Sequence, residues 1–119
     1  MLRAISFPFC VASSGPTSKI RQALRVSGLL SFFGKNIFSS YEIESWKPEP
    51  GLFLHAAKIM GFSPARCVVV EDSEVGLQAA TAAGMRSLKY TPRARESNHG
   101  TFCDMAVLPL LLDELARAA

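Results

Sequence analysis

The chain has 119 residues, of which 49% are hydrophobic and 19% are charged, and its formal net charge is +3. This length predicts a single domain that buries roughly two-thirds of the surface of the unfolded chain. No apolar run approaches the ~18 residues that a membrane-spanning helix needs, so we expect no membrane partner. The basic residues are dispersed and carry no recognition motif, so we expect no nucleic-acid partner.

The spacing of the cysteines and the composition of the first residues indicate the cellular compartment. Cys10, Cys67 and Cys103 are odd in number and widely spaced, with no C-x-x-C pair, so neither a disulfide framework nor a zinc site is indicated. We expect buried, reduced thiols. Residues 1–11 are mildly apolar, but Pro8 interrupts them and the layout of a signal peptide is weak. A cytoplasmic location is therefore expected.

Strand and helix patterns alternate along the chain, and glycines mark helix ends. The alternation predicts an α/β fold with a doubly wound parallel sheet. Ile20, Ala23 and Leu24 would form the apolar face of the first long helix, and Leu52, Ala56 and Ile59 that of the second. The predicted strands are 7–12, 37–40, 67–70 and 85–89, and the predicted helices are 16–27, 49–60, 74–83 and 110–117.

The carboxy-terminal third of the chain holds a local group of basic residues and one of the two histidines. Arg86, Lys89, Arg93 and Arg95 cluster near the end of the predicted sheet. Residues 93–99 predict a solvated loop, which could lie at the rim of a site for an anionic ligand. We expect His55, in a helix pattern, and His99, in that loop, to be structural or exposed.

The strand predicted at 67–70 halts at two carboxylates, Glu71 and Asp72. Its continuous apolar run is typical of a strand buried on both faces of a parallel sheet. In open α/β sheets ligands bind outside the carboxyl ends of the strands, so these acids are candidate Mg²⁺ ligands, with water and phosphate oxygens completing the shell. Alternatively, Asp72 or Ser73 simply caps the helix that starts near Glu74.

Three separated segments share an order with a known family. They are Val-Ala-Ser-Ser-Gly-Pro at 11–16, Trp-Lys-Pro-Glu-Pro at 46–50 and Val-Glu-Asp-Ser-Glu-Val-Gly-Leu-Gln-Ala-Ala at 70–80, with Ala-Ala-Gly-Met at 82–85 behind them. Together they resemble the haloacid-dehalogenase-like (HAD) phosphatases, in particular the sugar-phosphate and phosphoglycolate phosphatase branch. The resemblance spans residues 8–92. It implies a Rossmann-like core and Mg²⁺-dependent hydrolysis of phosphate monoesters on small molecules.

The resemblance also implies roles for single residues. The Ser13 hydroxyl and the Ser14 backbone N–H would bind the phosphoryl group at a helix N-terminus, although Ser13 could instead be a helix cap. Lys47, projecting from an extended Lys-Pro segment, would neutralise phosphate charge; otherwise it is a solvated loop lysine. Asp72 would bind the magnesium ion, with Glu71 as its partner in the first or second coordination shell.

Two further positions follow from the same match. Ser73 resembles a residue that helps to orient the metal-binding acids. Gly76, in the first turn of the following helix, is expected to permit close helix packing.

The chain departs from the family at the residues that start its reaction. An aspartate nucleophile in an Asp-x-Asp motif, whose second aspartate is the general acid/base, is absent, and the only aspartates are Asp72, Asp104 and Asp113. The helical cap is absent too. Residues 1–119 therefore resemble the carboxy-terminal part of a HAD core, one incomplete domain, and we expect weak or no Mg²⁺ binding and no activity alone. The alternative is a catalytically dead HAD-fold binding or interaction domain. A receiver or flavodoxin-like module is a third, less favoured reading.

In this family the nucleophile strand lies between the strand that ends at Ser13 and the strand that ends at Glu71. Without it, two strand edges would carry unpaired N–H and C=O groups, which are templates for pairing. We therefore expect either direct pairing of the two strands, or pairing with another chain, as in a homo-oligomer or with a complementing fragment.

Overall fold

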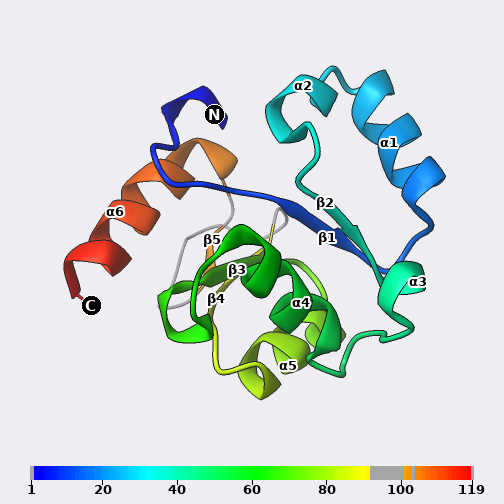
Figure 1. Ribbon diagram of the computed structural model, residues 1–119. Helices are drawn as coiled ribbons and strands as arrows, with labels where there is room; N and C mark the ends of the chain where they lie inside the picture. The colour runs from blue at the N-terminus through cyan, green and yellow to red at the C-terminus, as the bar shows by residue number, and fades with distance from the viewer. Residues whose placement is uncertain (1, 92–100, 103, 119) are drawn as a thin grey trace.

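The computed structural model describes residues 2–91, 101–102 and 104–118. Short strands alternate with helices along most of the chain (Figure 1). In chain order the elements are η1 (Leu2–Ala4), β1 (Val11–Ser13), α1 (Thr17–Val26), α2 (Leu30–Phe33), β2 (Ile37–Ser39), α3 (Ser40–Ile43), α4 (Gly51–Met60), η2 (Pro64–Arg66), β3 (Val68–Glu71), α5 (Glu74–Ala82), β4 (Arg86–Tyr90), β5 (Thr101–Phe102), η3 (Met105–Val107) and α6 (Leu108–Ala118).

The strands form two parallel half-sheets. In the first, β1 pairs with β2, and Val11 is in register with Ile37. In the second, the order is β3-β4-β5, and Val68 is in register with Arg86. The parallel α/β prediction is confirmed. Among the described residues no ladder joins β1 to β3, so the first of the two alternatives, direct pairing of these strands, is wrong.

Helix α4 connects the two half-sheets. It contacts β1, β2 and α5, and its buried face supplies Phe53 and Ala57 to a core cluster that holds Val69 of β3. The positions just before these on the same helix, Leu52 and Ala56, pack in a second cluster with Phe38 of β2. The two half-sheets therefore share one apolar helix although they share no backbone hydrogen bonds among the described residues.

The opposite face of the second half-sheet is covered by α6. Leu88 of β4, Phe102 of β5 and Leu108 of α6 form a third cluster, against which Ile5 packs. Figure 1 shows the start of the chain beside α6. The Arg86 guanidinium donates a hydrogen bond of 3.0 Å to the carbonyl oxygen of Leu115. Helices thus lie on both faces of β3 and β4, which is the doubly wound arrangement.

Burial along β3 differs from the sequence prediction. Val69 is buried under α4 and α5, whereas Val70 is 37% exposed. Successive side chains alternate between the faces of a strand, so Val68 and Val70 share the α6 face. Val68 packs on the α6 cluster, but Val70 is not among the residues of that cluster. The prediction that this strand is buried on both faces is therefore wrong at Val70.

Other differences concern element ends and helix faces. The strand predicted at 7–12 is hydrogen-bonded only at Val11–Ser13, because its ladder with β2 has just those three residue pairs. Strand β5 and the short helices η1, η2, α2 and α3 were not predicted. Ile59, assigned to a buried helix face, is 60% exposed, and Ala23 of α1 is exposed as well. On α4, Phe53 and Ala57 are buried in place of Ile59.

The cysteines and histidines are only partly described. Cys10 and Cys67 are free and half-buried, and Cys103 lies outside the described residues. His55 is half-buried and packs edge-on against Phe38, with 5.7 Å between ring centroids, whereas the predicted loop at 93–99, with His99, lies outside the described residues.

No helix in the described part of the chain is long and apolar enough to cross a membrane.

Candidate functional site

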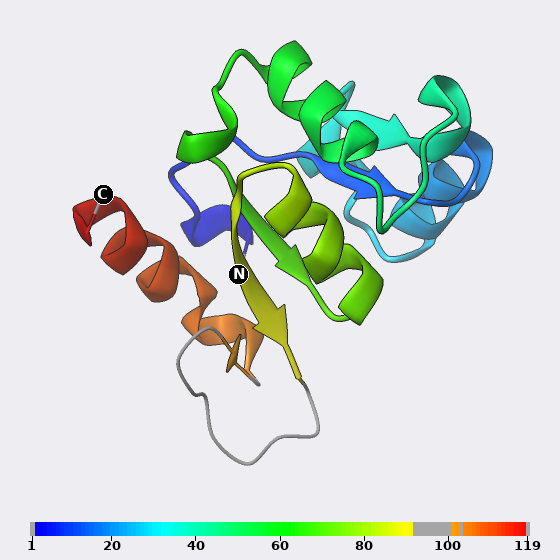
Figure 2. The same ribbon diagram turned by 90° about the horizontal axis from the view of Figure 1, so that it is seen from below.

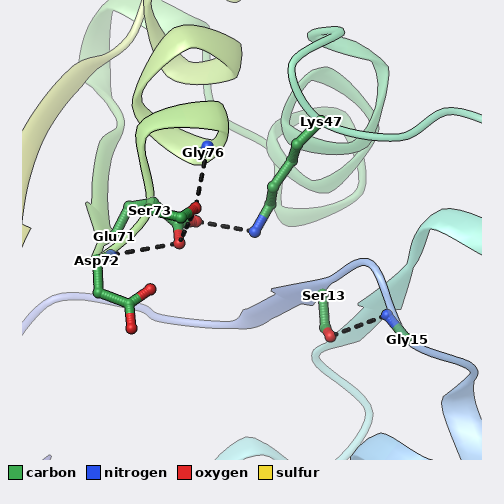
Figure 3. A network of polar contacts seen from close by, with 7 residues as sticks. All are labelled: Ser13, Gly15, Lys47, Glu71, Asp72, Ser73 and Gly76. Carbon is green, nitrogen blue, oxygen red and sulfur yellow. Dashed lines mark hydrogen bonds and ion pairs between the residues drawn. The ribbon is translucent and has the colours of Figure 1, made fainter.

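An ion pair between Lys47 and Glu71 is the centre of the site. The Lys47 Nζ lies 2.8 Å from Oε2 of Glu71, and each side chain is only 12% exposed. The ammonium also lies 5.3 Å from the centroid of the Phe53 ring, within cation–π range. The pair joins the turn after α3 to the carboxyl end of β3, and Figure 3 shows the lysine reaching across to the carboxylate.

The backbone around Lys47 is a turn. The Glu49 N–H donates to the carbonyl oxygen of Trp46 at 2.9 Å, and the peptide bond between Lys47 and Pro48 is cis. The prediction of an extended Lys-Pro segment is wrong. The lysine still projects inward, because its partner Glu71 and the Phe53 ring hold the side chain.

Both carboxylate oxygens of Glu71 have protein partners. Besides Lys47 on Oε2, Oε1 accepts hydrogen bonds from the Ser73 hydroxyl at 3.1 Å and the Asp72 N–H at 3.3 Å. Burial acts to raise the pKa of Glu71, but the hydrogen bond and charge of Lys47 and the hydrogen bonds of Ser73 outweigh it, so the pKa lies below its ordinary value. Glu71 is therefore ionised at neutral pH and positions Lys47.

Ser73 serves both Glu71 and α5. Its Oγ accepts a hydrogen bond of 3.2 Å from the Gly76 N–H, so Ser73, and not Asp72, is the cap of this helix. Gly76 lies directly over Glu71, where a Cβ would overlap with the carboxylate. The expectation that Gly76 permits close helix packing is confirmed, and the group that packs against the first turn of α5 is the Glu71 side chain of β3.

Asp72 is the acid with open oxygens. It is exposed, and its side chain makes no hydrogen bond or ion pair with the described residues; in Figure 3 its carboxylate points away from the Lys47–Glu71 pair. No cluster of three or more His, Cys, Asp or Glu side chains occurs in the described ranges. One carboxylate, with water and phosphate oxygens, is a ligand set that Mg²⁺ accepts, so Asp72 fits such an ion.

Ser13 and Ser14 lie where β1 turns into α1. The Ser13 Oγ accepts a hydrogen bond of 3.1 Å from the Gly15 N–H, and the Gly15 carbonyl accepts one of 2.6 Å from Ser39. Because Pro16 is the residue that precedes α1, Ser13 is not the helix cap. Ser14 is exposed and lies between Ser13 and Gly15. It stands three residues before Thr17, the first residue of the ten-residue helix α1, whose N-terminus carries the positive end of the helix dipole.

The structure thus places the five predicted site residues at the carboxyl ends of β1 and β3 and in the turn beside them. Figure 3 shows Ser13, Lys47 and Asp72 at this same edge of the fold. Ser39 was missed by sequence reasoning, although it ends β2, caps α3 through the Tyr41 N–H at 3.2 Å and fixes the Gly15 carbonyl. A serine at the end of a predicted strand was the available signal.

The chain matches the family model of a haloacid dehalogenase-like hydrolase over residues 1–84. It is 41% identical over 116 residues to 6-phosphogluconate phosphatase of Escherichia coli (strain K12), an alignment that covers 93% of this chain and 52% of that protein. The chain therefore spans about half the length of this relative.

Solved structures show the same likeness. A haloacid dehalogenase-like protein of unknown function from Agrobacterium tumefaciens superposes with a TM-score of 0.87 at 30% identity, covering 97% of this chain and 58% of that one. A HAD family hydrolase from Deinococcus radiodurans, solved with bound phosphate and sodium, gives a TM-score of 0.71 at 32% identity, covering 93% of this chain and 47% of that one.

Proposed function

The chain belongs to the haloacid dehalogenase-like hydrolases, and from that premise we propose that it carries the phosphate-binding half of a phosphatase site for small phosphorylated molecules. The observation that carries this proposal is the Lys47–Glu71 pair at the end of β3, with Asp72 beside it and Ser13 at the end of β1. The relative named 6-phosphogluconate phosphatase and the phosphate bound in the Deinococcus protein support this class of ligand.

Each residue would have a separate task at a bound phosphate. The Ser13 hydroxyl and the backbone N–H of Ser14, an exposed residue, would donate hydrogen bonds to its oxygens near the positive end of α1. Lys47 would neutralise negative charge, and Glu71 would hold the lysine in place while taking up part of its charge. Asp72 would hold a magnesium ion, which supplies further charge neutralisation when bound.

Phosphate-ester hydrolysis needs more than these groups. In the overall reaction the oxygen of water bonds to phosphorus, the ester P–O bond breaks, and the alcohol leaves with a proton. The 119 residues contain no Asp-x-Asp motif to supply a nucleophile and a general acid/base. We therefore propose that the chain alone does not turn over phosphate esters, and that catalytic carboxylates come from another segment. The substrate would be a phosphorylated sugar or sugar acid.

Titration with inorganic phosphate tests the anion site. We expect weak, saturable chemical-shift changes at Ser13, Ser14 and Lys47 in NMR spectra of the labelled chain. Lys47→Met should remove them, since Lys47 is the cation proposed to neutralise the phosphate, whereas Lys89 on the neighbouring strand β4 is paired with Glu74. Lys58→Met, which removes an exposed lysine of α4, is the matched control and should bind as the unmodified chain does. Equal weakening in both variants would show that phosphate responds only to net charge.

A catalytically dead binding domain is the second candidate, and the missing Asp-x-Asp motif favours it. The effect of Mg²⁺ on phosphate binding distinguishes these two candidate functions. Half of a phosphatase site should bind phosphate more tightly when Mg²⁺ is present, and Asp72→Asn should abolish that gain; a dead domain should show no such coupling. Turnover of a generic phosphate ester by the chain alone, lost in Asp72→Asn, would contradict the proposed inactivity.

A further inference from the structure

We propose that Tyr41 and Trp46 form a subsite for the carbon skeleton of the phosphorylated ligand, and that these two rings make the chain prefer sugar phosphates to smaller phosphate esters. This role rests on the proposed function, because the rings select a carbon skeleton only if the neighbouring groups hold its phosphate. It concerns binding and not the chemical step.

The two rings are exposed and lie side by side. Tyr41 is 58% exposed and Trp46 is 41% exposed. Their centroids are 5.3 Å apart and their planes meet at 82°, which is the edge-to-face arrangement that aromatic pairs prefer. Neither the Tyr41 hydroxyl nor the Trp46 indole N–H makes a hydrogen bond with the described residues. The pair therefore offers apolar ring surface together with two polar groups that a ligand can use.

Tyr41 is connected to the serine side of the anion site. Its backbone N–H donates a hydrogen bond of 3.2 Å to the Ser39 hydroxyl, which donates one of 2.6 Å to the carbonyl oxygen of Gly15. Ser39 is also in register with Ser13. Figure 1 and Figure 2 both show α3 where the β1 and β2 arrows end. Tyr41, in the first turn of α3, is thus attached to the loop that follows Ser13.

Trp46 is connected to the lysine side of the same site. It directly precedes Lys47, so the two Cα atoms are about 3.8 Å apart. The Trp46 carbonyl oxygen accepts a hydrogen bond of 2.9 Å from the Glu49 N–H, and the Ser45 N–H donates one of 3.3 Å to the first residue of α3. Backbone hydrogen bonds therefore hold the turn on both sides of Trp46. The ring pair joins the two groups that are proposed to bind phosphate.

The chemistry of the rings and their neighbours indicates the kind of ligand. A sugar phosphate joins its phosphate to a carbon chain with C–H groups, which pack on an aromatic face, and with hydroxyls, which exchange hydrogen bonds with a phenol and an indole N–H. Exposed carboxylates flank the rings along the chain, at Glu42, Glu44 and Glu49. A small polyol fits such a patch better than a protein partner, which needs a broad apolar surface.

Trp46 is the only tryptophan of the chain, so its fluorescence reports on this subsite. The probes are glucose 6-phosphate and methyl phosphate, compared at about pH 8, where both esters carry close to two negative charges. We expect the glucose ester to change the Trp46 emission saturably and to protect the indole from acrylamide quenching. Its Kd, from NMR shifts at Lys47, should be roughly tenfold lower than that of methyl phosphate.

Substitutions of the two rings test their part in this preference. Tyr41→Ala and Trp46→Ala should each reduce the preference for the glucose ester to about twofold or less and leave the affinity for methyl phosphate unchanged. Tyr41→Phe keeps the ring and should keep most of the preference. Phe7→Ala is the matched control, because it removes a ring of similar exposure, 40%, from the segment before β1. It should bind both esters as the unmodified chain does.

The outcomes separate this subsite from the anion site. Binding of methyl phosphate with equal affinity for both esters, or a preference that survives both alanine variants, would overturn the subsite alone. Failure of both esters to bind would overturn the proposed function and the subsite with it. Self-association of the unmodified chain by light scattering, lost in Tyr41→Ala, would make a second copy the occupant of the rings and would also overturn the subsite.

Discussion

At the residue scale, the position of Lys47 depends on residues that would not contact a phosphate. Glu71 holds the ammonium, Ser73 donates to Glu71, and Gly76 leaves room for the carboxylate. Asp72 was expected to bind the metal ion, with Glu71 as its partner in the first or second coordination shell. In the structure the two acids differ: both carboxylate oxygens of Glu71 have hydrogen-bond partners within the protein, and Asp72 is open to solvent.

The variant Gly76→Ala tests the close approach of Glu71 to Gly76, because the sign of the change in the free energy of unfolding depends on it. In an unobstructed helix, alanine would stabilise by about 1 kcal/mol relative to glycine. Here the new methyl group would overlap with Glu71, so we expect destabilisation by about 1–3 kcal/mol in urea unfolding. Gly15→Ala is the control: its Cβ would meet Ser13 at an ordinary 3.6 Å, and stability should change by less than about 0.5 kcal/mol. A stabilised Gly76→Ala variant would contradict the close approach of Glu71.

The Lys47–Glu71 pair should also make stability depend on pH. The pKa of Glu71 is lower in the folded chain than its ordinary value of about 4.3, so its contribution is complete above that value and is lost as pH falls through the folded pKa. Urea unfolding of the unmodified chain and of Glu71→Gln should therefore differ most near neutral pH and converge as the pH falls through the folded pKa of Glu71. Glu49→Gln, at an exposed site, should follow the unmodified curve. A constant difference across this range would exclude the ion pair as its source.

At the element scale, α4 is the helix on which both half-sheets depend. Its periodicity identified Leu52 and Ala56, which pack toward β2, but Phe53 and Ala57 complete the contact with β3. A single-sided amphipathic pattern was expected. The helix instead buries a wider face because it lies against two half-sheets at once, and this leaves Ile59 outside.

Phe53→Ala should separate the two half-sheets. Truncating this buried ring should lower stability by about 3–5 kcal/mol and speed amide exchange in β1 and β3 together, since both pack on α4. Leu54→Ala changes the neighbouring, 40% exposed position of the same helix and should cost less than about 0.5 kcal/mol. Faster exchange confined to one half-sheet would show that α4 does not couple them.

At the scale of the whole molecule, the space between the half-sheets also affects the cysteines. Cys10 and Cys67 precede β1 and β3 and line the same cavity. Burial, with a smaller contribution from the Cys67 thiol, raises the pKa of Cys10 to about 11, and burial raises the pKa of Cys67 as well. Both groups are therefore thiols at neutral pH, in keeping with the free state of these two residues.

The sequence by itself determined the α/β class, most helix ends and the motifs that carry the family, because these depend on periodicity, on glycine and on short runs such as Glu-Asp-Ser. It could not determine that the β1–β2 ladder has only three residue pairs, that Gly76 faces Glu71, or that β1 and β3 are not hydrogen-bonded to each other. Each of those depends on which chain segments lie side by side. Only the tertiary structure, in which α4 spans both half-sheets and Lys47 meets Glu71, decided them.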